Sequence, residues 1–202
     1  MQGVDLIFHH FPDLSDRQKE QFDQLKSLYE TWNAQINVIS RKDLDQFYVH
    51  HVLHSLAIAK LGILEDRNTV LDFGCGGGFP GIPLAIYYPD KQFHLVDSIA
   101  KKIKVVQGVA DALELDHVEA QAIRVETLKS KYDAITCRAV AQMVELRNWT
   151  EHLIANDGKY VFLKGGDLNE EIETSGWNAS ITSISDYFNE EFFETKKIVV
   201  VD

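Results

Sequence analysis

The sequence has few cysteines and no long uninterrupted hydrophobic run. Only Cys75 and Cys137 occur among 202 residues, too few for the disulfide framework of a small secreted protein. No stretch reaches the roughly 18 consecutive apolar residues of a membrane-spanning helix. The N-terminal residues also lack the basic segment and apolar run of a signal peptide. These absences predict a cytoplasmic protein that folds around its own core, with no membrane or metal required.

Basic residues are also scarce, since 20 Lys and Arg face 31 Asp and Glu, for a net charge of −11. The excess acid is uneven: residues 67–166 are neutral, whereas residues 167–202 have a net charge of −7. Tight nonspecific binding to RNA phosphates requires a basic face, which this composition does not supply. Selective action on a folded RNA or a ribonucleoprotein particle remains compatible with it.

Residues 1–66 have the pattern of an N-terminal helical extension. Ser15 with Gln18 is a capping-box pattern, and Ser40 with Asp43 is a second capping signal. Apolar residues follow at helical spacing after both signals: Phe22, Leu25, Leu28, Tyr29, Trp32 and Ile36, then Leu44, Phe47, Val52, Leu56 and Leu61. We expect the second helix to end near Gly62. Tyr29, Trp32 and Ile36 could stack on RNA bases, but this spacing favours a place in the core.

Residues 67–202 change to short apolar strands that alternate with amphipathic helices. Strands are predicted at 69–73, 92–96, 118–122, 132–137 and 159–164, helices at 81–88, 98–114 and 142–154, and two later strands at 181–185 and 196–201. Strands and helices in this alternation build βαβ units. The pattern therefore predicts an α/β domain with a doubly wound, mostly parallel sheet.

The most informative segment is a glycine-dense turn between the first strand and the first helix of this domain. Gly74, Gly76 and their neighbours permit positive φ and let a ligand approach the backbone beside a helix N-terminus. Phe79 occupies the position of the third glycine in a dinucleotide fingerprint, and no phosphate-loop lysine is present. With Asp72 before it, the turn suits a cofactor that has a carboxylate, an amine and a sulfonium instead of a phosphate.

Asp97 ends the second strand, where an acid can accept hydrogen bonds from both ribose hydroxyls. The turn and this acid together predict S-adenosylmethionine as the cofactor. The alternative is a tight structural turn followed by an ordinary surface acid.

Several motifs resemble those of one bacterial family, the 16S ribosomal RNA guanine-N7 methyltransferases, also known as glucose-inhibited division protein B. They are Gly74–Ala85, Leu95-Val-Asp-Ser98 with Lys101-Lys102, Arg138-Ala139, Leu163-Lys164-Gly165, Tyr29-x-x-Trp32-Asn33-x-x-x-Asn37 and His51-x-x-x-Ser55-Leu56. The resemblance runs from about residue 20 to the end of the chain. One departure is His54, where the family usually has Asp.

The resemblance implies a Rossmann-like class I methyltransferase that uses S-adenosyl-L-methionine. Its expected substrate is N7 of a guanine in 16S ribosomal RNA, free or in an assembling small subunit, and we expect a monomer. By the same resemblance, the cofactor contacts fall on Gly74, Phe79, Val125, Glu126 and Arg138.

Guanine N7 carries a lone pair and no proton at neutral pH, so it can attack a sulfonium methyl without a general base. This agrees with a sequence in which no triad, carboxylate pair or metal cluster stands out. Arg138 and Lys164 end the fourth and fifth strands, and we predict that they orient the guanine or the cofactor and position phosphates. The alternative is that both are solvated surface cations.

Other interpretations are weaker. Amine methylation would favour an Asn/Asp-Pro-Pro-Tyr/Phe motif, which residues 136–139 do not contain, and methylation at pyrimidine C5 would make Cys137 a nucleophile with no evident activating partner. His50 and His54 have the spacing of zinc ligands, but the glutamate of that motif is absent. The basic run Lys101-Lys102-x-Lys104 either meets RNA phosphate or is a solvated face. Two other functions stay open: a non-catalytic ribosome assembly factor that binds S-adenosylmethionine or RNA, and a nicotinamide-dependent oxidoreductase.

Overall fold

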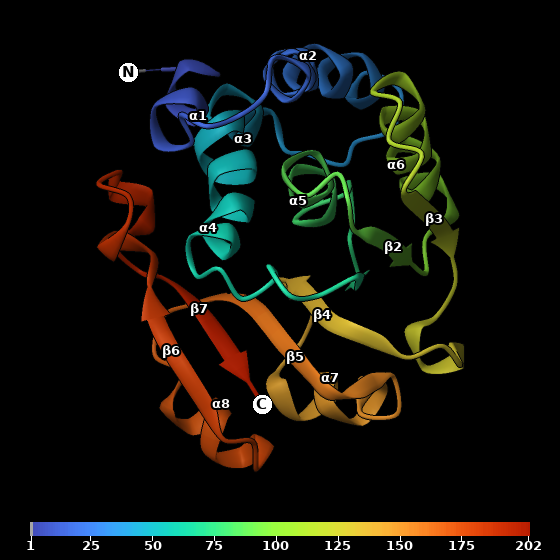
Figure 1. Cartoon of the computed structure of the whole chain (residues 1–202), viewed down its shortest axis with the longest axis vertical. Helices are drawn as coiled ribbons and strands as arrows, with labels where there is room; N and C mark the ends of the chain where they lie inside the picture. Colours follow the sequence, from blue (N-terminus) through green and yellow to red (C-terminus); the bar gives the residue numbers. More distant parts are fainter. Residues whose placement is uncertain (1) are drawn as a thin grey trace.

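The computed structural model describes residues 2–202 and is built around a seven-stranded mixed sheet (Figure 1). The strands are β1 (Thr69–Phe73), β2 (Gln92–Asp97), β3 (Val118–Ala122), β4 (Tyr132–Arg138), β5 (Ile154–Gly165), β6 (Ala179–Ser183) and β7 (Lys196–Val201). Their order across the sheet is β3-β2-β1-β4-β5-β7-β6. β1 to β5 run parallel, and β7 is antiparallel to both β5 and β6. The predicted doubly wound α/β sheet is therefore confirmed.

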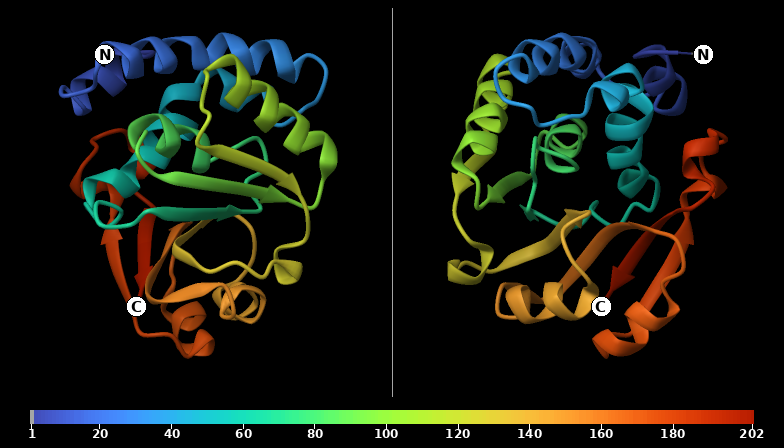
Figure 2. Two further views of the ribbon diagram at one scale, coloured as in Figure 1. Left: turned by 45° about the vertical axis from the view of Figure 1, so that its right-hand side comes forward. Right: turned by 180° about the vertical axis from the view of Figure 1, so that it is seen from behind.

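Helices cover both faces of the sheet. The helices and helical turns are α1 (Asp5–His10), α2 (Asp16–Asn33), α3 (Arg41–Asp45), η1 (Tyr48–Leu53), α4 (His54–Lys60), α5 (Gly81–Tyr87), α6 (Ala100–Ala112), η2 (Val125–Thr127), α7 (Met143–Thr150), α8 (Asn169–Ser175), η3 (Ile184–Asp186) and η4 (Glu191–Phe193). Figures 1 and 2 show α1 to α6 on one side of the sheet and α7 with α8 on the other. None of the helices within residues 2–202 is long and apolar enough to cross a membrane.

The alternation of side chains along β1 explains the two layers. Val70 belongs to the core cluster under α2, α5 and α6, whereas Leu71 and Phe73 belong to the cluster under α7. Successive residues of a strand point to opposite faces, so a strand with helices on both sides is buried along its length. This is why the short run from Val70 to Phe73 contains no exposed side chain.

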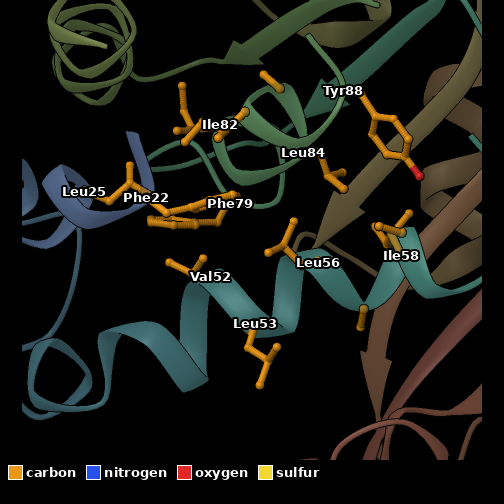
Figure 3. Close-up of a cluster of buried hydrophobic side chains, with 14 of the residues drawn as sticks. Phe22, Leu25, Val52, Leu53, Leu56, Ile58, Phe79, Ile82, Leu84 and Tyr88 are labelled. Atoms are coloured by element: carbon orange, nitrogen blue, oxygen red, sulfur yellow. The ribbon is translucent and has the colours of Figure 1, made fainter. Parts of the chain in front are cut away.

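The N-terminal helices share one core with the sheet domain. Figure 3 shows Phe22, Val52 and Leu56 from the N-terminal layer facing Phe79 and Ile82 of the glycine loop and α5. All five side chains are buried in the same cluster. The helical segment within residues 1–66 is thus packed directly on the loop that the sequence marks as the cofactor site.

The structure corrects several predicted boundaries. The helix expected between Ser40 and Gly62 is interrupted: α3 ends at Asp45, η1 is a π-helix, and α4 ends at Lys60. The helix expected at 142–154 ends at Thr150, because Ile154 already pairs with Tyr132 at the start of β5. The strand expected at 181–185 lies two residues earlier, at 179–183. Helices α1 and α8 had no clear pattern in the sequence.

Candidate functional site

The glycine loop after β1 holds three residues in the left-handed region, with φ of +62° at Gly74, +57° at Gly76 and +102° at Gly78. A Cβ at Gly78 would lie 2.7 Å from Ile82 and 3.1 Å from the Tyr29 hydroxyl. A Cβ at Gly76 would meet nothing within 4 Å. Gly78 is therefore required by packing, whereas Gly76 leaves open space where a ligand can lie against the backbone.

Asp72 anchors this loop from below the sheet edge. Its Oδ2 accepts a hydrogen bond of 2.8 Å from the Gly81 amide at the start of α5, and Thr136 donates to Oδ1 at 3.3 Å. Asp72 is fully buried, and this desolvation raises the pKa of its carboxyl to about 7. Asp72 thus fixes the helix N-terminus relative to β1 and β4.

Two cavities open at the carboxyl edge of the parallel strands, and Gly74 lines both of them. The small cavity, about 210 Å³, lies between the ends of β1 and β2 and the η2 turn. The large cavity, about 510 Å³, lies over the ends of β1, β4 and β5 and beneath η1 and η4. Ligands of open α/β sheets bind at this edge. A molecule that passes over Gly74 would occupy both cavities.

The small cavity contains the residues expected to hold a nucleoside. Asp97, Val125 and Glu126 all line it, together with Val140 and Trp149. Val125 is buried and Glu126 is exposed, so the η2 turn presents an apolar surface and a polar rim. Apolar walls with a few placed polar groups suit a planar base with an attached ribose.

Asp97 is held in place by backbone amides. Its Oδ1 accepts from Ile99 N at 2.8 Å, its Oδ2 accepts from Gly76 N at 3.1 Å, and the Lys102 ammonium lies 3.7 Å from Oδ2. These contacts tie the acid at the end of β2 to the glycine loop. A carboxylate has about four acceptor sites, so two backbone bonds leave capacity for ribose hydroxyls. Lys102, from the basic run of α6, lines the large cavity.

Arg138 lines the large cavity and contacts three other residues that line it. Its Nη1 donates to the carbonyl oxygen of His50 at 2.8 Å, and its Nη2 donates to Nδ1 of His51 at 2.9 Å. The guanidinium also lies over the Phe79 ring, with its carbon 5.4 Å from the ring centroid. Burial lowers the pKa of Arg138 to about 10, so it stays cationic at neutral pH. The side chain therefore joins β4, the glycine loop and η1.

Three histidines of the N-terminal layer line the same cavity. Burial, with the nearby Arg138 charge, lowers the pKa of His51 to about 3 and lowers that of His54 well below its usual value. Both rings are neutral at physiological pH. His50 pairs with Asp43 at 3.0 Å and stacks on Phe192, with 4.1 Å between the ring centroids.

Lys164 also lines the large cavity, but its ammonium already has partners. It donates to the carbonyl oxygen of Ala141 at 2.7 Å and forms a short ion pair with Glu171 of α8. Glu171 in turn accepts from the amide of Met143 at the start of α7. In this arrangement Lys164 holds the segment after Arg138, and the predicted contact with guanine or cofactor stays a prediction.

The surroundings of the two cysteines do not favour a nucleophile or a metal site. Cys137 is buried in the cluster under α7, where burial raises its pKa, and it lines neither the large nor the small cavity. A nucleophilic cysteine instead needs surroundings that lower the pKa of its thiol. Cys75 belongs to the other cluster and lines the large cavity, and burial raises the pKa of its thiol. Within the part of the chain that the structure describes, no group of three or more His, Cys, Asp or Glu side chains could hold a metal ion.

Sequence reasoning did not single out every side chain of the site. Phe192 and Lys196 come from the C-terminal segment and line the large cavity opposite η1. Nothing local to residues 187–196 indicates this position, because it depends on β7 returning beside β5. His51 was visible in the sequence as part of a family motif and as a neighbour of the His50 and His54 pair. By contrast, the predicted site residues Gly74, Gly76, Phe79, Asp97, Val125, Glu126, Arg138 and Lys164 all line one or both cavities.

Comparisons with known proteins agree with this geometry. Residues 18–199 match the family model GidB, rRNA small subunit methyltransferase G. The ribosomal RNA small subunit methyltransferase G of Flavobacterium psychrophilum is 52% identical over 201 residues, which cover 96% of each chain. Among solved structures, the DhpI–SAH complex has a TM-score of 0.58 at 14% identity, covering 92% of this chain and 96% of that one. A SAM-dependent methyltransferase from Aquifex aeolicus has a TM-score of 0.57 at 13% identity, covering 81% and 98%. These two likenesses show a shared fold.

Proposed function

The chain belongs to the family of rRNA small subunit methyltransferase G, and on this premise we propose that it methylates N7 of a guanine in 16S ribosomal RNA. Membership makes it a methyltransferase of ribosomal RNA with S-adenosyl-L-methionine as cofactor. The nicotinamide-dependent alternative is set aside by the same findings. The choice of N7, the site residues, a cytoplasmic location and a monomeric state are our proposals.

The junction of the two cavities at Gly74 carries the proposal. An adenosine in the small cavity would place the sulfonium near Gly74, with the methionyl part against the open surface of Gly76. We assign Asp97 to the ribose, Val125 and Glu126 to the adenine, and Gly74 and Phe79 to the methionyl region. The rest of the large cavity then receives the guanine beside Arg138.

When bound, S-adenosylmethionine would supply an electrophilic methyl group. The N7 lone pair would form the new bond, and the electron pair of the broken methyl–sulfur bond would stay on sulfur. No proton has to move, so the chain needs to supply alignment and a dry pocket. Positive charge passes from sulfur to the base. Arg138 orients the two partners through its remaining N–H groups, and Lys164 positions the Ala139–Ala141 segment through the Ala141 carbonyl.

The test is methyl transfer from labelled S-adenosylmethionine to small-subunit particles from cells that lack this enzyme, with the nucleosides resolved by mass spectrometry. We expect label in 7-methylguanosine at one position. Arg138→Ala should lower kcat/KM by about 100-fold or more, as for the loss of an orienting contact. A circular dichroism melt of the variant controls for folding.

Label in a different nucleoside would overturn the N7 assignment. Tight cofactor binding without transfer to any ribosomal RNA would instead favour the non-catalytic assembly factor.

A further inference from the structure

The protonation pattern of His51 is fixed by its neighbour. Arg138 has only hydrogen-bond donors, so the 2.9 Å contact from its Nη2 requires Nδ1 of His51 to be an acceptor. The depressed pKa of His51, caused first by burial and then by the Arg138 charge, keeps the ring neutral. The single ring proton therefore lies on Nε2.

This Nε2–H group is a donor without a hydrogen-bond partner among the described groups, and it is shielded from solvent. His51 itself lines the large cavity and packs on Phe79, with 4.9 Å between the ring centroids. A buried unpaired donor destabilises the protein unless a ligand acceptor meets it. Arg138 occupies Nδ1, so Nε2–H is the one ring donor of His51 that is left without a partner among the described residues.

We propose that His51 determines specificity for guanine by donating its Nε2–H to O6 of the target base. This inference rests on the proposed function, because it places the guanine in the large cavity. Guanine presents two acceptors on this edge, N7 and O6. N7 must remain free to attack the methyl group, so O6 is the acceptor left for recognition. Adenine has an amino group in that place and would set a donor against a donor.

A neutral donor also suits the direction of charge transfer. The base becomes cationic as N7 is methylated, and a second positive charge at O6 would oppose the reaction. The same Arg138 contact that fixes the tautomer also disfavours protonation of His51. His51 can therefore discriminate between bases with little cost to the rate, which is the behaviour expected of a specificity residue.

Two substitutions test the roles of the two ring nitrogens of His51 separately. In His51→Asn the amide oxygen lies near the position of Nδ1 and can still accept from Arg138, but nothing replaces the Nε2 donor. In His51→Gln the longer side chain restores a donor amide near Nε2. His9→Asn, at an exposed histidine of α1, is the matched control.

The probe is small-subunit RNA, assembled into particles, that carries at the methylated position either guanosine or 2,6-diaminopurine riboside. The second base keeps N7 and the 2-amino group but replaces O6 with an amine. The wild type should prefer guanosine by about 100-fold or more in kcat/KM, because a site built for a hydrogen bond rejects an analogue that cannot form it. His51→Asn should reduce this ratio by at least about tenfold, chiefly by losing activity on guanosine, whereas His51→Gln and His9→Asn should retain it.

A structural role for His51 would lower activity on both substrates equally and leave the ratio unchanged, and that result would overturn the inference. A wild type that shows no preference between the two bases would do the same. Failure of the wild type to form 7-methylguanosine on the guanosine particle would contradict the proposed function instead, so the two failures are distinguishable.

Discussion

Ala139 follows Arg138 directly and has a φ of +54°, in the region that L-residues rarely adopt. Its side chain is exposed at the edge of the large cavity. The left-handed conformation costs an L-residue roughly 1–2 kcal/mol. The contacts on either side explain why it persists: Arg138 is bound to η1, and the Ala141 carbonyl is bound by Lys164. The turn between these anchors leaves little choice of backbone path.

Replacing Ala139 with Gly should therefore leave the free energy of unfolding unchanged or raise it by up to about 1 kcal/mol, because relief of strain offsets the added flexibility of the unfolded chain. Ala141→Gly is the matched control at a position without positive φ, and it should lose about 0.5–1 kcal/mol. Urea denaturation measures both. Equal destabilisation by the two substitutions would argue against strain at Ala139.

At the scale of elements, α2 supports the glycine loop from the N-terminal layer. Tyr29 is completely buried, and its hydroxyl donates to the carbonyl oxygen of Gly77 at 2.6 Å. The predicted capping box of Ser15 and Gln18 fixes the start of this helix. At its other end, Asn33 accepts from the amides of Val38 and Ile39 and closes the connection to α3. The motif residues Tyr29 and Asn33 thus have structural roles beside the proposed cofactor site.

Tyr29→Phe should lower the free energy of unfolding by about 1–3 kcal/mol, because it leaves the Gly77 carbonyl buried without this donor. We also expect weaker binding of S-adenosylmethionine, measured by titration calorimetry, since the loop loses its support. Tyr187→Phe, at a tyrosine that is 36% exposed, should stay within about 0.5 kcal/mol of the wild type. If Tyr29→Phe destabilises the protein but leaves its affinity for S-adenosylmethionine unchanged, the support of the glycine loop by α2 does not contribute to cofactor binding.

At the scale of the whole molecule, buried ionisable groups set the response to pH. Burial lowers the pKa of His51 to about 3 and lowers that of His54 well below its usual value, so as the pH falls through about 6.5 the unfolded chain binds protons at these sites that the folded chain does not. Asp72, with a pKa raised to about 7, binds one proton in the folded chain that the unfolded chain has released. Stability rises with pH when the unfolded state binds more protons, so these two effects oppose each other.

Because two histidines oppose one carboxyl, the free energy of unfolding should fall between pH 6 and 4, by about 1.4 kcal/mol per pH unit for each proton by which the unfolded chain exceeds the folded one. Asp72→Asn removes the opposing contribution and should make this slope steeper, whereas His54→Leu should make it shallower. Urea denaturation across this pH range, with each protein compared with itself at pH 7, provides the measurement. A slope that is the same in all three proteins would mean that other groups control the acid response.

The sequence by itself determined the succession of the main strands and helices along the chain, the glycine loop, the acid after β2 and the family. Each of these depends on local periodicity, on steric needs of a single turn, or on a motif of adjacent residues. It placed the ends of elements less well, as at the π-helical turn η1, and it contained no clear pattern for α8. At both places tertiary packing outweighs local preference. Only the tertiary structure decided which groups Arg138, His51, Lys164 and Cys137 contact.

The physical reason is sequence separation. The bond from Arg138 to His51 joins residues 87 positions apart, and Phe192 meets His50 only because β7 returns antiparallel beside β5. Which nitrogen of a histidine carries the proton, and whether a lysine is free or already paired, depends on such partners. A local pattern can place these side chains at one edge of a sheet, but only the folded chain fixes what they contact.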